Sequence, residues 1–380
     1  MEIWLLVSIT LLFLMVVGIA LVYCGSVRFK NALTCLCFPF LLLPLTYVVW
    51  RLLGERIIFS AMENPFVVPL LKYSEAVASG PYFLFQYLFC FISVLVLWGS
   101  TLERVTMKFY GVFTFLWLLL VYCPVSRWLL NKEGWLREFG VIDFAGGFTV
   151  HVTSGFSALI LANCIGRRVD YFQLRNKFSQ PLIFFGSFLI WIGWFGFNAG
   201  SSIAFNDSTV VAFENTFVAG LVSLGVWCLI DYIHTPNRVT LTGISLGLVS
   251  GLVAITPAAG LVDVNDSIFI GLLSGVFCNY ASRYMHKVFK VDDTVDVFPT
   301  HGIGGVVGAL ATGYLVLKGG ANSYFYPNLV ACLVVAFYSM TVTWVLVKLL
   351  RLVMEARVSR KDEEDGSDIR IFGENIVNLR

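Results

Sequence analysis

The chain has 380 residues, of which 58% are hydrophobic, 16% aromatic and only 13% charged. Together with a mean hydropathy of +0.81, this composition excludes a water-soluble globule, because soluble domains carry fewer apolar and more charged residues. The formal net charge of +2 gives no indication of nucleic acid as a partner. We therefore predict an all-α polytopic membrane protein.

Eleven segments are apolar enough to be membrane-spanning helices, which need about 20 residues to cross about 30 Å of hydrocarbon. They cover residues 2–24, 33–53, 82–103, 109–130, 143–165, 181–205, 212–232, 240–260, 266–288, 300–318 and 328–353. The first segment is longer than the apolar part of a signal peptide, so we expect it to be retained. Residues 1–354 are predicted to form one membrane domain, and the charged residues 355–380 are predicted to form a tail.

Basic residues concentrate in alternate connections between these segments. They are Arg28, Lys30, Arg104, Lys108, Arg167, Arg168, Arg175, Lys177, Arg238, Arg283, Lys287 and Lys290. Connections rich in Lys and Arg lie on the cytoplasmic side. An odd number of spans across the cell membrane then places the N-terminus outside the cell and the tail in the cytoplasm.

Signals for catalysis or for metal binding are weak. The stretch "GISLG", residues 243–247, matches the nucleophile pattern G-x-S-x-G, but it lies in an apolar segment where small-residue packing is the favoured interpretation. The chain has no H-E-x-x-H and no P-loop. The close pair Cys35 and Cys37 has no second pair to complete a metal site. We predict that the protein is not an enzyme and has no metal or cofactor.

The stretch "VIDFAGGFTVHVTSGFSALILAN", residues 141–163, contains a histidine within an apolar run. His151 follows Asp143 by eight residues, which places its ring roughly 12 Å deeper along a helix, near the bilayer midplane. Asp143 stands where an N-cap would be and is expected to accept the backbone amides of Ala145 and Gly146. Ionisable groups inside membranes are rare and mark ion or proton pathways. We therefore expect a functional role for His151.

His301 occupies a similar place in the tenth segment. Each of the two histidines follows an aspartate, Asp143 or Asp296, and precedes small residues at a helix-packing spacing. Two five-helix halves of opposite topology would produce this pattern. The other histidines, His234 and His286, fall at cytoplasmic helix ends, where a solvated surface position is the favoured interpretation.

The stretch "WIGWFGFNAGSS", residues 191–202, combines aromatic, small and polar residues near the outer end of the sixth segment. Two interpretations are equally supported. The stretch is either a glycine-packed helix end with interfacial aromatics, or a site where aromatic faces receive a cation and Ser201 accepts a hydrogen bond from it.

Three motifs in order, "DFAGGFTVH", "WFGFNAGS" and "VDDTVDVFPTHGIGGVVGALATG", resemble the ammonium transporter family of Amt, Mep and Rh proteins. The resemblance runs from "GIALVYCGSVRFKN" at Gly18 to "GEN" at Gly373 and is closer to the Amt branch. It implies an eleven-helix subunit with an inverted five-plus-five repeat and a pore through each subunit of a homotrimer. It also implies ammonium as substrate, with methylammonium as an analogue.

The resemblance assigns roles to individual residues. It implies that His151 and His301 are a pore pair that shares a proton, that Phe89 is the outer gate and that Phe197 is the inner gate. It further implies that the Ser201 hydroxyl belongs to the external ammonium site and that Asp143 supports this site. The placement of His301 beside His151 comes from the resemblance alone.

One position departs from the family pattern. Many members have a tryptophan six residues after the proline of a "YCP"-type motif, but "YCPVSRWLL" has Leu130 there. Trp128 is two residues earlier, about 200° away around a helix, so it is not expected to replace the missing ring. We expect a weaker or differently tuned ammonium site, because one cation–π contact contributes roughly 0.5–2 kcal/mol.

Transport is the expected function, with ammonium bound outside, deprotonated, and passed on as ammonia. The alternative is an ammonium sensor that binds at the same site and signals through its tail, a partner or a fused domain with little transport. The resemblance also implies a PII-type regulatory protein as a partner at the cytoplasmic face.

Overall fold

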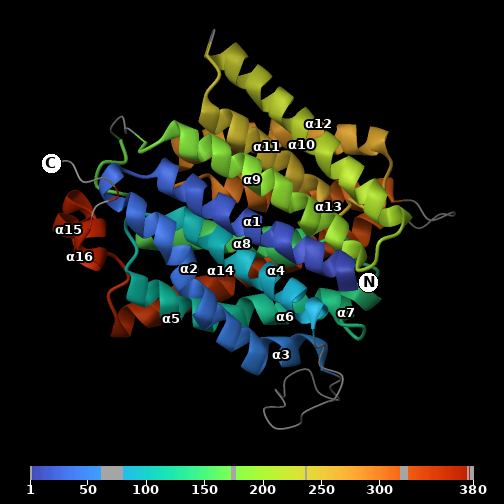
Figure 1. Cartoon of the computed structure of the whole chain (residues 1–380), viewed down its shortest axis with the longest axis horizontal. Coiled ribbons are helices and arrows are strands. Elements are labelled where there is room, and N and C mark those ends of the chain that lie inside the picture. Colours follow the sequence, from blue (N-terminus) through green and yellow to red (C-terminus); the bar gives the residue numbers. More distant parts are fainter. Residues whose placement is uncertain are drawn as a thin grey trace.

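The computed structural model describes residues 2–60, 80–172, 177–235, 238–316, 324–374 and 376. In these ranges the protein is a bundle of helices with nearly parallel axes (Figure 1). Glu2 begins the first helix at one end of the bundle, and the short tail helices lie at the opposite end (Figure 1). The predicted all-helical fold is confirmed for this part of the chain. Residues 317–318 of the tenth predicted segment, and residues 375 and 377–380 of the predicted tail, lie outside it.

The first half of the chain supplies helices that are partly interrupted by π-helical turns. They are α1 (Glu2–Ser26), η1 (Phe29–Asn31), α2 (Ala32–Val49), η2 (Trp50–Gly54), α3 (Glu55–Phe59), α4 (Pro81–Trp98), η3 (Gly99–Thr101), α5 (Met107–Trp117), η4 (Leu118–Tyr122), α6 (Cys123–Leu130), α7 (Trp135–Glu138), η5 (Gly147–Val152) and α8 (Thr153–Ile165). Several of these pieces continue one another, so α2, η2 and α3 form one long helix.

The second half continues in the same way. Its elements are α9 (Gln180–Asn198), η6 (Ala199–Ser202), α10 (Asp207–His234), α11 (Leu241–Ile255), α12 (Val264–Tyr284), η7 (Met285–Phe289), η8 (Phe298–Ile303), α13 (Gly304–Leu315), α14 (Phe325–Val353), α15 (Arg360–Asp365) and α16 (Asp368–Phe372). Among the described residues, eight continuous helices are long and apolar enough to cross a membrane. The α11, α12 and η8–α13 segments fall short of that standard, so their crossing of the membrane stays a prediction.

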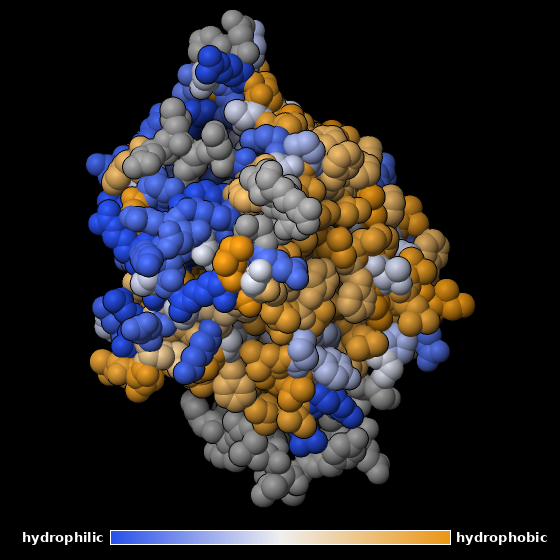
Figure 2. Space-filling view, turned by 60° about the vertical axis from the view of Figure 1, so that its left-hand side comes forward, coloured by the Kyte–Doolittle hydropathy of each residue, from blue (hydrophilic) through white to orange (hydrophobic). Residues whose placement is uncertain are grey.

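The surface of the bundle explains its apolar composition. Large apolar side chains point outward from four of its helices, and Phe185, Phe217, Phe277 and Phe337 are between 44% and 71% exposed. Figure 2 shows a broad hydrophobic area beside a hydrophilic region at the end where the tail lies. Apolar area of this extent is stable against lipid and unstable in water. A multi-pass membrane protein follows from it.

Close backbone packing holds the centre of the bundle together. Gly155 on α8 faces Gly302 on η8, and a Cβ atom added to Gly155 would lie 2.2 Å from the Gly302 nitrogen. Only glycine permits this approach, because any side chain would overlap the facing backbone. The two segments that carry His151 and His301 are thereby brought into direct contact.

The charged tail is an ordered part of the structure. Its residue Asp368 is buried and accepts the backbone amides of Leu33 and Thr34 at 2.9 Å and 2.8 Å, at the start of α2. Glu363 is also buried, accepts the Val169 amide at 2.7 Å and forms an ion pair with Arg357 at 2.7 Å. These bonds satisfy helix-start amides and fix the tail against the end of the bundle.

Candidate functional site

A column of four rings runs through the bundle, in which Phe89, Phe197 and His151 are stacked and His301 is tilted against His151. The rings of Phe89 and Phe197 are parallel within 18° and their centroids lie 4.1 Å apart. The Phe197 and His151 centroids are 5.7 Å apart, and those of His151 and His301 are 5.2 Å apart. All four side chains are buried. Residues from α4, α9, η5 and η8, far apart in sequence, therefore form one continuous column.

The two histidines of the column lie within hydrogen-bonding distance of each other. Their Nδ1 atoms are 3.2 Å apart. Two unprotonated nitrogens would repel each other at this distance, so one Nδ1 donates and the other accepts. The predicted pairing of His151 with His301 is therefore present in the geometry.

A third group determines the direction of this hydrogen bond. The Thr256 hydroxyl donates to the Leu252 carbonyl at 2.8 Å and receives the Trp194 indole N–H at 3.1 Å. Its proton is thus in use, and toward His151 Nε2, at 3.4 Å, it only accepts. His151 accordingly carries its proton on Nε2 and accepts at Nδ1 from His301. The His301 Nε2 atom is then unprotonated.

An aspartate lies eight residues before each histidine. It caps the start of the π-helical segment that carries that histidine, η5 for His151 and η8 for His301. Asp143 accepts the amides of Gly146, Gly147 and Phe148 at 2.6–2.9 Å. The predicted bond to Gly146 is confirmed, whereas the bond predicted to Ala145 was wrong, because η5 begins at Gly147, three residues later than an N-cap at Asp143 implies.

The aspartate that matches Asp143 in the structure is not Asp296, the one nearest to His301 in sequence. Asp293, not Asp296, repeats the role of Asp143, since its Oδ2 accepts the Phe298 amide at 2.7 Å. The Asp296 carboxylate instead accepts from His286 Nε2 at 2.8 Å. His286 was predicted to be only a solvated surface residue, and this bond shows that it has a partner. Asp143 and Asp293 therefore hold the starts of η5 and η8 in matching ways.

A cavity of about 670 Å³ opens at one end of the ring column, and we call it the Phe89 cavity. Four of the predicted site residues line it: Phe89, Leu130, Asp143 and Ser201. The Ser201 hydroxyl donates to the Phe197 carbonyl at 2.9 Å, which leaves its lone pairs free to accept a hydrogen bond from a solute. The carboxylate of Asp143 adds a negative charge to the wall. This combination suits a small cation that donates hydrogen bonds.

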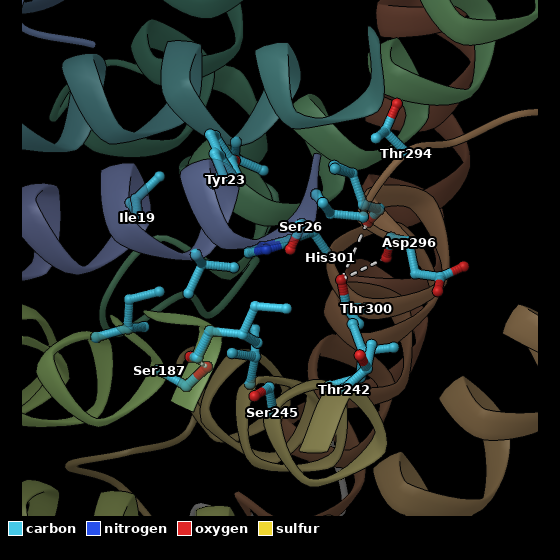
Figure 3. A pocket seen from close by; sticks show the side chains of 18 of the residues that line it. Ile19, Tyr23, Ser26, Ser187, Thr242, Ser245, Thr294, Asp296, Thr300 and His301 are labelled. Atoms are coloured by element: carbon cyan, nitrogen blue, oxygen red, sulfur yellow. Dashed lines mark hydrogen bonds between the residues drawn. The ribbon is translucent and has the colours of Figure 1, made fainter. Parts of the chain in front are cut away.

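A second cavity, of about 100 Å³, lies at the other end of the column, and we call it the His301 cavity. Figure 3 shows His301 pointing into it, with Thr242 and Ser245 of α11 on one side and Thr294 and Asp296 on another. Hydroxyl groups line most of its polar wall. The column of rings separates the two cavities.

The sequence model of the Ammonium Transporter Family matches residues 3–376, almost the whole chain. The chain belongs to this family. It is 36% identical to Ammonium transporter Amt1 of Archaeoglobus fulgidus over 383 residues, which cover 96% of each chain. It is 34% identical to the Ammonium transporter of Bacillus subtilis, with 96% of this chain and 95% of that one covered.

Solved structures of the ammonium transporter family share the fold. Mep2 of Candida albicans superposes with a TM-score of 0.85 at 28% identity, over 95% of this chain and 86% of that one. A structure named Sensor Amt Protein superposes with a TM-score of 0.90 at 24% identity, over 98% of each chain, and this likeness concerns the fold alone. The resemblance predicted from the three motifs is confirmed at the level of the ammonium transporter family.

The wall of the Phe89 cavity is aliphatic where many family members were expected to have a tryptophan. Leu130 is half-buried there, at the end of α6. The neighbouring Trp128 packs its ring against Tyr338 at 4.8 Å and against Trp135 at 5.8 Å. Trp128 is therefore engaged away from the cavity wall, and the Leu130 position contributes no aromatic face.

Sequence reasoning did not identify Arg137 as a site residue. Its guanidinium lies at the Phe89 cavity and donates to the Leu130 carbonyl at 3.0 Å. Arg137 lies in the connection after the fourth predicted segment, and nothing in the local sequence shows that α7 turns it back over α6. Tyr82 and Tyr324, which also line the cavity, were missed for the same reason.

The "GISLG" stretch serves packing and the wall of the second cavity. A Cβ atom on Gly247 would lie 2.6 Å from the Trp227 Cβ atom, so this glycine permits α10 and α11 to touch. The Ser245 hydroxyl donates to the Leu241 carbonyl at 3.0 Å and lines the His301 cavity. Among the described residues, no group of three or more His, Cys, Asp or Glu side chains is arranged to hold a metal ion.

Proposed function

We propose that this protein moves ammonium across a cell membrane by separating it into ammonia and a proton. Ammonium enters the Phe89 cavity, where Asp143 and Ser201 attract it, and loses a proton there. Ammonia then passes Phe89 and Phe197 and continues along the histidine pair into the His301 cavity. The observation that carries the proposal is the ring column with its hydrogen-bonded histidine pair, placed between two cavities.

Physical chemistry favours ammonia over ammonium inside the column. A bare cation in an apolar medium costs tens of kcal/mol, so the stacked rings reject both ammonium and potassium, whereas neutral ammonia has no such penalty. The hydrogen bond between the histidines gives the pair a route for relay: once both rings have exchanged tautomers, His151 Nε2 accepts a proton from the external side, the Nδ1 proton passes to His301, and His301 Nε2 releases a proton toward the cytoplasm. If net charge crosses, an inward negative potential contributes about 2.3 kcal/mol per charge per 100 mV.

Eleven spans with an external N-terminus and an internal tail are part of this proposal. The basic connections support the orientation. The matched caps of Asp143 and Asp293, each eight residues before a histidine, support an inverted repeat of five plus five helices. In this orientation the Phe89 cavity faces outside and the His301 cavity faces the cytoplasm.

The proposal includes a homotrimer with one pore per subunit and a PII-type protein as a partner at the cytoplasmic face. The number of subunits is measured by the mass of the detergent-solubilised particle, corrected for bound detergent. Binding of the partner is measured by retention of a purified PII-type protein on the immobilised transporter.

A sensor with little transport is the second candidate. Leu130 favours it, because an aliphatic wall weakens the Phe89 cavity as a place for rapid ammonium recruitment. Against it stand the intact histidine pair and the second cavity, which binding alone does not require. The transporters among its relatives, at 34–36% identity, also support transport.

Solid-supported-membrane electrophysiology on purified protein in liposomes tests the proposal, together with uptake of labelled methylammonium. We expect sustained, saturable transport of ammonium and methylammonium, none of potassium, and loss or altered selectivity in His151→Ala. His234→Ala, which changes a histidine outside the column, is the matched control. Binding transients without sustained current or uptake would refute transport and favour the sensor.

A further inference from the structure

A lysine lies on the wall of the His301 cavity. Lys177, in the connection between α8 and α9, lines this cavity together with His301. Its Nζ atom donates to the Thr242 hydroxyl of α11 at 2.6 Å. The side chain is therefore anchored, and its charge is fixed beside the end of the ring column.

The surroundings of Lys177 leave its charge uncompensated at close range. In the part of the chain that the structure describes, no carboxylate oxygen lies within 4 Å of its Nζ atom, and its hydrogen bond goes to a neutral hydroxyl. Asp296, on the same cavity wall, accepts from His286 at 2.8 Å. Burial lowers the pKa of Lys177 from its ordinary value, and the Asp296 carboxylate opposes this effect.

The chemistry of this group is that of the proposed substrate. A lysine side chain ends in a primary ammonium group, so it is a tethered equivalent of methylammonium. Its ammonium group is held at the Thr242 hydroxyl on the cavity wall. The remaining polar wall consists mainly of hydroxyls such as Ser245 and Thr300, and its carboxylate, Asp296, is already paired with His286.

We propose that Lys177 determines the specificity of the cytoplasmic mouth by excluding cations from the His301 cavity. Its fixed positive charge repels ammonium and potassium on that side, so the solute that leaves the column there is neutral ammonia. This inference rests on the transport function and on the orientation proposed above. It makes the two mouths of the pore unequal, with cations admitted at the Phe89 cavity and rejected at the His301 cavity.

The test measures how strongly cytoplasmic cations compete with uptake. Oocytes that express the protein take up labelled methylammonium from outside while unlabelled methylammonium is injected at graded concentrations. In the wild type we expect the injected cation to inhibit poorly. In Lys177→Met the concentration that halves uptake should fall about threefold or more, because a like charge has been removed from a confined site. The external half-saturating concentration should stay unchanged.

Three variants serve as controls for this measurement. Lys177→Arg keeps the charge and should behave as the wild type. Lys348→Met removes an exposed lysine from α14 and should have no effect. If Lys177→Met does not reach the cell surface, Lys177→Gln tests the same point with a polar side chain of similar length.

The results separate a role for the Lys177 charge from a failure of transport. An unchanged inhibition curve in Lys177→Met, with uptake retained, overturns the inference, and so does an equal shift in Lys348→Met. A shift of the external half-saturating concentration as large as the internal one assigns Lys177 a merely structural role and also overturns it. Absence of uptake by the wild type refutes the transport proposal itself, and the inference falls with it.

Discussion

Replacing Leu130 by tryptophan should restore the ring that the Phe89 cavity lacks. Leu130 is half-buried on the cavity wall, and the cavity volume of about 670 Å³ leaves room for a larger side chain. A tryptophan there would present a face to a cation held by Ser201. One cation–π contact contributes about 0.5–2 kcal/mol, and every 1.4 kcal/mol is about tenfold in affinity. The half-saturating ammonium concentration should therefore fall by roughly two- to thirtyfold.

The guanidinium of Arg137 competes for the same ring. It donates to the Leu130 carbonyl at 3.0 Å, so it lies close enough to stack on an introduced tryptophan. If it does, the half-saturating ammonium concentration of Leu130→Trp will fall only by about twofold, the low end of the expected range. Adding Arg137→Gln to Leu130→Trp should then give the larger fall in half-saturating concentration, because the ring face becomes free for ammonium.

Uptake of labelled methylammonium against external ammonium concentration measures this effect. Leu130→Met, which keeps the volume without an aromatic face, is the matched control and should match the wild type. If Leu130→Trp is folded and both it and the double variant keep the wild-type half-saturating concentration, the cation does not sit beside Leu130. The external site would then lie elsewhere.

Three further changes have definite expected results. Arg137→Gln alone should lower the half-saturating ammonium concentration by about two- to fivefold in low salt and less in high salt, because a like charge at the exposed mouth is screened; equal effects at both salt concentrations would contradict this. Gly155→Ala should lower the thermal midpoint in detergent by several degrees, since its Cβ would overlap Gly302, whereas Gly225→Ala, with nothing within 4 Å, should not. Burial raises the pKa of Asp293 to about 7, so its protonated form favours folding below about pH 4 and this stability is lost as the pH rises toward 7. Asp293→Asn should therefore have a higher thermal midpoint than the wild type at pH 8, and the difference should be smaller at pH 5. An equal difference at both pH values would count against a charged, buried Asp293.

The membrane fold was largely readable from sequence because hydropathy acts locally. Each of the eleven predicted segments contains helix in the described residues, and the predicted start of the first, at residue 2, agrees with α1. The depth of His151 stays a prediction, since residues 143–146 are not helical and helix rise does not apply across them. The role of Gly146 as a partner of Asp143 followed from local capping rules.

The contacts between distant segments could not be read in this way. The choice between Asp293 and Asp296 depends on where η8 begins, and the two carboxylates are only three residues apart. The docking of Asp368 onto Thr34 joins residues 334 positions apart. Arg137 and Lys177 became site residues only when the fold brought their connections over the two cavities. Pattern and propensity carry no information on such pairings.

The position of these two basic residues bears on whether the protein transports or only senses ammonium. A receptor needs one cavity that binds a cation, and Arg137 at the Phe89 cavity would weaken it in either case. A receptor has no use for a second cavity behind a buried column of rings, nor for a fixed lysine within it. A pore for neutral ammonia needs both the second cavity and the lysine, because cations must be kept from the far end of the histidine pair. Lys177 is thus better explained by passage through the column than by binding in front of it.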